Sequence, residues 1–250
     1  MSPVKHVVIS AIALMVCMLV FEFTDLDIWV QNILFDASNN TWLLNKSNDT
    51  LHFWLYYLPK KVIMFFSLGI LLSLVFLRKQ PWVKNYQRGL IVVLLSVLII
   101  PSVVGALKAT TNVACPKHLV NYGGEIPYIG VFEAYPQSLS LTGTYRCFPA
   151  GHASGGFALM ALYFLAKSRR RRTQLLSFGI FLGWLTGGYK MLIGDHFLSH
   201  TLVTMILAWL LINVNVLASS VFDALSMRFL TLKAGPVKAT IESAKNVHEV

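Results

Sequence analysis

The residues best suited to chemistry lie in the stretch Cys147–Gly156, which contains one histidine. Pro149 and Gly151 favour a turn there, and an apolar helix is expected from about Ala153. The first N–H groups of a helix have no partner within it, and the helix dipole is positive at this end, so the position suits an anion. His152 could exchange a proton with an anion held there. Taken alone, the stretch is more typical of an ordinary helix start with a surface histidine, and only further residues elsewhere in the chain could indicate a site.

A second group of ionisable side chains follows further along the chain, at Lys190, His196 and His200. The long polar loop at residues 108–151 adds three more cations, which are Lys108, Lys117 and Arg146. Phosphoryl transfer needs mainly fixed positive charge around three oxygens, a nucleophile in line, and an acid for the leaving group. Lysine, arginine and histidine side chains gathered at one face of the protein would therefore form a phosphate site.

The spacing of His196 and His200 is also that of a metal-binding pair, with His152 as a third ligand. Because the surrounding lysines would repel a cation, we prefer the phosphate interpretation and expect no bound metal. The other histidines are interpreted as surface or interface residues; they are His6, His52, His118 and His248.

Composition places these residues in a membrane protein. Apolar residues make up 56% of the 250 residues, whereas charged residues make up only 13%. Soluble domains have about 25% charged residues, and several apolar runs approach the roughly 20 residues that cross a bilayer. The net charge of +10 could suggest nucleic-acid binding, but a basic face for DNA would not be divided by lipid-buried helices.

The apolar runs predict an all-α, polytopic bundle of six transmembrane helices in one membrane domain, residues 1–218, with the motifs at 108–200. A polar tail at residues 219–250 is expected in the cytoplasm. The first run is not followed by a small-x-small cleavage site, so it is interpreted as a span rather than a signal peptide. The expected spans are residues 7–21, 57–77, 89–107, 153–166, 175–193 and 198–217.

Two short basic clusters, at residues 78–88 and 167–172, set the expected orientation. Cytoplasmic loops of membrane proteins are enriched in lysine and arginine, so both clusters and both chain termini are expected in the cytoplasm. Counting spans then places loops 22–55, 108–151 and 194–197 together on the outer side. All candidate site residues belong to that side.

Three motifs in this order resemble the type-2 phosphatidic acid phosphatase (PAP2) superfamily, which shares its site with vanadium haloperoxidases. The family pattern is K-x6-R-P, then P-S-G-H, then S-R-x5-H-x3-D. This sequence has Lys108-x6-Cys115-Pro116, Pro149-Ala150-Gly151-His152 and Tyr189-Lys190-x5-His196-x3-His200. The resemblance covers about residues 50–217, including the six-span layout.

The resemblance implies a role for each matching position. His196 is the expected nucleophile, which forms a phosphohistidine, and His152 is the expected acid and then base. His200 occupies the position that orients the nucleophile. The family's phosphatases use no metal or other cofactor. The candidate phosphate-binding residues are Lys108, Lys117, Arg146, Ala150, Gly151 and Lys190.

Of the positions that depart from the family pattern, four concern the expected site chemistry. Cys115 replaces an arginine, and Lys117 or Arg146 could supply the missing charge. Ala150 lacks the hydroxyl of the family serine, and Lys190 keeps the charge of an arginine but not its fork. His200 replaces an aspartate; a neutral imidazole could still accept the Nδ1–H of the nucleophile but would stabilise a cation less well.

Two of the three cysteines, Cys115 and Cys147, lie in the same outer loop. In an oxidising bacterial periplasm this favours a disulfide over two free thiols, and the bond would hold the first motif near the second. Cys17 lies within the first span and is interpreted as a packing residue.

These observations predict a lipid phosphate phosphatase or phosphotransferase in a bacterial inner membrane, with its active site on the periplasmic face. Candidate substrates are the phosphates of lipid A, undecaprenyl (di)phosphate, phosphatidate and phosphatidylglycerophosphate. The alternative is a phospholipid-binding or transport protein that kept the fold and lost the chemistry. The oligomeric state stays open, and no nucleic-acid partner is expected.

Overall fold

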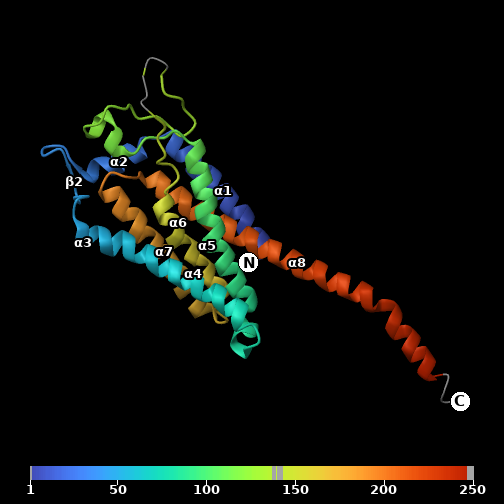
Figure 1. Cartoon of the computed structure of the whole chain (residues 1–250). Coiled ribbons are helices and arrows are strands. Elements are labelled where there is room, and N and C mark those ends of the chain that lie inside the picture. The colour runs from blue at the N-terminus through green and yellow to red at the C-terminus, as the bar shows by residue number, and fades with distance from the viewer. Residues whose placement is uncertain (1, 137–138, 140–142, 247–250) are drawn as a thin grey trace.

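Long helices make up most of the structure, a computed structural model that describes residues 2–136, 139 and 143–246 (Figure 1). The first half contains α1 (Pro3–Glu22), α2 (Leu26–Ile33), β1 (Phe35–Asp36), β2 (Thr41–Trp42), α3 (Asp49–His52), the π-helix η1 (Phe53–Tyr57), α4 (Leu58–Phe76) and α5 (Pro81–Thr110). The second half contains the 3-10 helices η2 (Pro116–His118) and η3 (Val120–Tyr122), then α6 (Gly151–Ala158), the 3-10 helix η4 (Leu159–Phe164), α7 (Arg169–Leu192) and α8 (Leu198–Asn246).

Five helical segments within the described residues are long and apolar enough to cross a membrane. They are Pro3–Glu22, Asp49–Phe76, Pro81–Thr110, Arg169–Leu192 and Leu198–Phe222. Large apolar side chains such as Phe65 and Phe181 are exposed on these helices, as lipid-facing surfaces require. These five segments overlap five of the six expected spans, which agrees with the prediction of an integral, multi-pass membrane protein.

The expected span at residues 153–166 differs from the other five. It consists of α6 followed by η4, which together contain 14 residues (8 and 6) and extend about 24 Å, less than the roughly 30 Å of a bilayer core. Ala153, Phe157 and Ala158 are completely buried. The prediction of six spans is therefore corrected to five long spans and one short buried segment, because a helix buried among other helices has the same apolar composition as one facing lipid.

Close backbone contact holds α6 against α7. A Cβ atom on Gly156 would lie 2.5 Å from the backbone nitrogen of Gly183, and a Cβ on Gly183 would lie 2.1 Å from the ring of Phe157. Small residues at such positions allow membrane helices to approach each other closely. Larger side chains here would push α6, and the histidine at its start, away from α7.

The two ends of the bundle carry different chemistry. α5 and α7 both begin at the basic clusters and end at the candidate site, so these clusters lie at the end opposite the histidines. The clusters also meet in space, because Lys167 Nζ lies 5.1 Å from the ring centroid of Tyr86. This arrangement agrees with the separation of basic and motif-bearing loops that the spans predicted.

A small cap of loops and short elements covers the histidine end. The strands β1 and β2 pair antiparallel, with Phe35 opposite Trp42, and add one two-residue pair to a structure that is otherwise all-α, as predicted. The rings of Phe35, Trp42 and Tyr122 contact one another, with centroids 4.8 to 5.2 Å apart. Leu119 and Phe197 are buried in the same apolar cluster, which anchors the cap to the start of α8.

The predicted boundary at residues 218 and 219 lies within a continuous helix. α8 runs from Leu198 to Asn246, and Figure 1 shows its last part extending away from the other helices. The tail is thus a continuation of the last long helix as far as it is described.

Candidate active site

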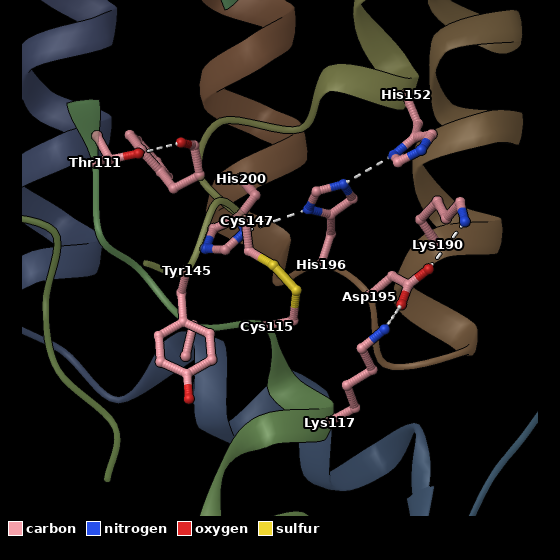
Figure 2. Close-up of a disulfide and its surroundings, with 12 residues drawn as sticks. Thr111, Cys115, Lys117, Tyr145, Cys147, His152, Lys190, Asp195, His196 and His200 are labelled. Carbon is pink, nitrogen blue, oxygen red and sulfur yellow. Dashed lines mark hydrogen bonds and ion pairs between the residues drawn. A yellow bond between two sulfur atoms is a disulfide. The ribbon is translucent and has the colours of Figure 1, made fainter. Parts of the chain in front are cut away.

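Three histidines lie in a row at the capped end of the bundle (Figure 2). His152 comes from the first turn of α6, His196 from the short connection between α7 and α8, and His200 from the first turn of α8. His152 Nδ1 lies 3.3 Å from His196 Nε2, and His196 Nδ1 lies 3.4 Å from His200 Nδ1. Each ring nitrogen of His196 therefore faces another imidazole.

The turn after α7 fixes the direction of His196. Gly194 has a φ of 72°, and a Cβ there would lie 2.3 Å from the Trp42 ring, so this position requires glycine. The N–H groups of Asp195 and His196 both donate to the Lys190 carbonyl, at 2.8 and 3.2 Å. The last turn of α7 thus holds Lys190, Asp195 and His196 in one compact unit.

Helix α2 holds the other side of this turn. The Asp27 carboxylate accepts hydrogen bonds from Ser199 N (2.8 Å) and Ser199 Oγ, so it caps the start of α8 as an N-cap residue would. Gln31 Nε2 donates to the Met191 carbonyl at 3.0 Å. Burial raises the pKa of Asp27 to about 6, although the bonds from Ser199 act in the opposite direction.

His200 is placed to orient the nucleophile candidate. Its ring hydrogen-bonds the Cys147 backbone and lies 1% exposed between the rings of Phe148 and Phe197. A neutral His200 that donates its proton to the Cys147 carbonyl has its other nitrogen free to accept the Nδ1–H of His196. In that tautomer the lone pair of His196 Nε2 points toward His152.

Burial and the neighbouring imidazoles keep His196 neutral. Its side chain is 1% exposed, and burial, followed by the nearby His200 and His152 imidazoles, lowers its pKa well below the ordinary value. A neutral imidazole has the free lone pair that a nucleophile requires.

Asp195 joins two of the candidate phosphate-binding lysines. Lys117 Nζ donates to Asp195 Oδ1 at 2.7 Å, and Lys190 Nζ donates to Asp195 Oδ2 at 2.9 Å. Burial opposes ionisation of this carboxyl, but the bonds from Lys117 and Lys190 outweigh it and lower the pKa of Asp195 to about 2. Asp195 thus stays ionised and holds both cations beside His196.

The third lysine lies at the start of α6. A Cβ on Gly151 would be 3.7 Å from Lys108 Nζ, so this ammonium group lies against the turn that begins the helix. Lys46, from the loop before α3, interacts electrostatically with Asp195 and Lys117. The site therefore contains more cations than the three motifs predicted.

The predicted disulfide between Cys115 and Cys147 is present, with Cα atoms 5.2 Å apart. Next to it, the Cys147 N–H donates to the Val113 carbonyl at 3.1 Å. The bond joins the segment that carries Lys117 to the segment that leads into α6 and contacts His200.

Two candidate phosphate-binding residues have other surroundings. The Ala150 N–H donates to the His200 carbonyl (3.1 Å) and to Thr204 Oγ1 (2.9 Å), so it anchors the turn to α8 instead of facing a ligand. Arg146 is exposed and is not among the residues that line the cavity next to His152. Lys117 does not line this cavity either, but its bond to Asp195 Oδ1 places it beside the residue that precedes His196.

A cavity of about 620 Å³ opens between α4, α5 and the start of α6. Lys108, Gly151 and His152 line it near the histidine row, and apolar residues of α4 and α5 such as Leu68, Leu71, Leu94 and Leu98 line it further along the helices. The cavity thus joins a cationic end to a long apolar wall within the membrane-spanning region.

Tyr56 is a site residue that the motifs did not predict. Its ring centroid lies 5.1 Å from that of His152 and 5.0 Å from Lys190 Nζ, and it belongs to the π-helix η1, an irregularity that is frequent at functional sites. Asp27 and Asp195 were also not predicted. Of the two, only Asp195 could have been suspected from the sequence, because it directly precedes His196.

Comparison with known families agrees with this geometry. The family model described as "PAP2 superfamily" matches residues 89–222, just over half of the chain. The chain belongs to the PAP2 superfamily. The match includes every member of the three motifs, and PAP2 members are generally phosphatases, so lipid phosphate phosphatase-type activity is implied. No curated protein and no solved structure matches this PAP2 chain significantly.

The PAP2 motifs do not converge on a metal site in this structure. Within the described ranges, no group of three or more His, Cys, Asp or Glu side chains is placed to hold a metal ion. The three imidazoles instead contact one another in sequence, and lysine ammonium groups occupy their surroundings.

Proposed function

We propose that this PAP2 protein removes phosphate from a membrane lipid at the periplasmic face of a bacterial inner membrane. The main support is the 3.3 Å contact between His152 Nδ1 and His196 Nε2. It places the candidate acid next to the candidate nucleophile, in a region that also contains lysine side chains. The orientation rests on the basic clusters at the opposite end. Substrate candidates are lipid A phosphates, undecaprenyl (di)phosphate, phosphatidate and phosphatidylglycerophosphate.

In the proposed first step, His196 Nε2 attacks the phosphorus atom and the bond from phosphorus to the leaving oxygen breaks. His152, in its protonated form, gives its proton to that oxygen. In the second step His152 takes a proton from water, whose oxygen attacks the phosphohistidine and releases inorganic phosphate and neutral His196. A lipid hydroxyl in place of water would make the same protein a phosphotransferase.

The lysines are proposed to hold the phosphate oxygens in both steps. Lys108, Lys190 and Lys117 supply charge, and the first N–H groups of α6, beginning at Gly151, supply hydrogen bonds. His200 is proposed to orient His196. The apolar part of the lipid would lie along α4 and α5 in the cavity of about 620 Å³, with its phosphate at the end near Lys108.

The test is phosphate release from a panel of these lipids by the purified protein, with a chelator present throughout. We expect release from at least one lipid and an acid-labile phosphoryl label on the protein. The His196→Ala variant should lose both, and His152→Ala should slow release by about 10²–10⁴-fold. His118→Ala, in the same cap but outside the row, is the matched control.

Full activity in both the His196 and the His152 variants, with the proteins folded, would reject this mechanism. Lipid binding without turnover by the wild-type protein would instead indicate the alternative, a phospholipid-binding or transport protein with the PAP2 fold. The replacement of the family aspartate by His200 is the observation that favours this alternative.

A further inference from the structure

A second cavity, of about 460 Å³, lies at the end of the bundle opposite the histidines. It is enclosed by the start of α1, the start of α5, the end of η4 and the middle of α8. The polar and charged residues among those that line it are His6, Asn85, Tyr86, Arg88, Tyr163, Lys167, Arg172 and Asn213. The proposed phosphatase reaction uses none of these residues.

The wall of this cavity contains an unpartnered polar atom. Asn213 is 0% exposed, and its Nδ2 donates to the Trp209 carbonyl at 2.8 Å. Its Oδ1 is buried and has no hydrogen-bond partner among the described residues. An unsatisfied buried acceptor is costly, so this oxygen is suited to a donor group that enters the cavity.

Two cations are held at the rim. Lys167 Nζ lies 5.1 Å from the Tyr86 ring centroid, and the Arg172 guanidinium carbon lies 5.6 Å from the Tyr163 ring centroid. Arg172 Nε also donates to the Ala166 carbonyl at 2.9 Å. Both residues are exposed and line the cavity, and no acidic residue is among the described residues that line it.

The shortness of the α6–η4 segment provides the space. η4 ends at Phe164, and the following backbone packs against Gly89, where a Cβ would lie 2.9 Å from the Phe164 carbonyl oxygen. The chain therefore turns away before reaching the full depth of the neighbouring helices. The cavity lies beside the starts of α1, α5 and α7, where the expected orientation would place the lipid headgroups of the cytoplasmic leaflet.

We propose that this cavity binds the headgroup of an anionic phospholipid from the leaflet opposite the histidine site. Lys167 and Arg172 bind the phosphodiester, and a headgroup hydroxyl donates to Asn213 Oδ1. A phosphoglycerol headgroup has both features: one negative charge and hydroxyl donors beyond the phosphate. Basic residues at the cytoplasmic end of a span attract anionic lipid in general, but the buried amide adds a requirement for a donor.

The experiment measures lipid retention by the full-length protein in detergent, by native mass spectrometry. The probes are phosphatidylglycerol, phosphatidylmethanol with the same charge but no headgroup hydroxyl, phosphatidylcholine, and inorganic phosphate as competitor. We expect retention of phosphatidylglycerol above the other two lipids, with no displacement by inorganic phosphate. Lys167→Ala combined with Arg172→Ala should weaken retention by about tenfold or more, because this pair makes the charge-assisted contacts with the phosphodiester in the proposed complex.

The matched control is Arg170→Ala with Arg171→Ala, which removes the same charge from exposed neighbours that do not line the cavity. It should retain the lipid within about twofold of the wild type, since surface mutations away from specific contacts have small effects. Asn213→Leu should abolish the preference for phosphatidylglycerol over phosphatidylmethanol, and its unfolding temperature without lipid verifies that it folds.

Three outcomes would overturn the proposal. Equal losses in the two double variants would show a diffuse attraction to basic residues instead of a built site. Equal retention of phosphatidylcholine would remove the charge requirement. Displacement of the lipid by inorganic phosphate would assign the cavity to a free anion.

Discussion

His152 Nδ1 and His196 Nε2 are in direct contact at 3.3 Å, and no atom separates them. Phosphorus must lie about 3 Å from the attacking nitrogen, with the leaving oxygen on its far side, so substrate binding has to separate the two rings. His196 is buried and contacts His200 on its other side, whereas His152 is partly exposed beside the cavity. His152 is therefore the ring that we expect to move.

Replacing His200 by aspartate restores the family residue and tests the imidazole pair. A carboxylate favours the charged form of His196, so we expect the pKa of His196 to rise. Because only neutral His196 can attack, the acid side of the kcat/KM profile should move to higher pH. His200→Asn, which can accept the same hydrogen bond without charge, should leave that side in place; the profile of each variant is the measurement.

Asp195→Asn removes the anion between Lys117 and Lys190. The pKa of Asp195 is lowered to about 2, so its stabilising effect is present above pH 4 and is lost as the pH falls toward 2. We expect the variant to be less stable by about 2 kcal/mol at pH 7, with the difference shrinking below pH 4. Thermal unfolding in detergent measures this, and the exposed Asp49→Asn should show no such loss.

Asp27 should give the opposite pH dependence. Burial raises its pKa to about 6, so the folded protein binds a proton more readily than the unfolded chain, and stability falls as the pH rises from about 4 to about 6. The full effect is about 3 kcal/mol. Asp27→Asn, which mimics the protonated form, should therefore unfold at a higher temperature than the wild type at pH 8 and match it near pH 4.

Asp27→Ala separates the hydrogen bonds from the charge. It removes the cap on Ser199, which is worth about 1–2 kcal/mol, and should lower the unfolding temperature at pH 4. A lower unfolding temperature for Asp27→Asn at pH 8 would show that the charged bonds outweigh burial, contrary to this prediction.

The Cys115–Cys147 disulfide should support both stability and activity. It closes a loop with a sequence separation of 32 residues, for which the loop-entropy model gives about 3–4 kcal/mol. We expect Cys115→Ser with Cys147→Ser to lower the unfolding temperature and the rate of phosphate release. Reductant should reproduce the effect in the wild type and in Cys17→Ser, and should change nothing in the double variant.

Much of the bundle could be predicted from the sequence, because a helix that faces lipid must be apolar along its whole length. That rule identified five long helices, and the positive-inside rule identified the basic clusters at residues 78–88 and 167–172. It failed for α6 and η4, since a short helix enclosed by α5, α7 and α8 is equally apolar. The β1–β2 pair was missed because two-residue strands leave no alternating pattern to detect.

Motif spacing predicted which histidines and lysines gather at one end, and their catalytic roles stay predictions. Spacing could not identify Asp27, which contacts Ser199 from 172 residues away. It also could not distinguish Lys117 from Arg146 as the replacement cation, or show that the Ala150 N–H donates to α8. Each of these contacts joins segments that are far apart in the sequence, and no sequence motif links such segments.

The cross-link between the loop after α5 and the loop before α6 has a consequence for biogenesis. Such bonds form only in oxidising surroundings, so in the proposed orientation a newly inserted chain gains this brace after the loop has been translocated. Until then, the segment that carries Lys117 and the backbone that contacts His200 are held together only by non-covalent contacts. An immature protein that still lacks the bond would therefore release phosphate more slowly than the mature one, so full activity would develop only after translocation.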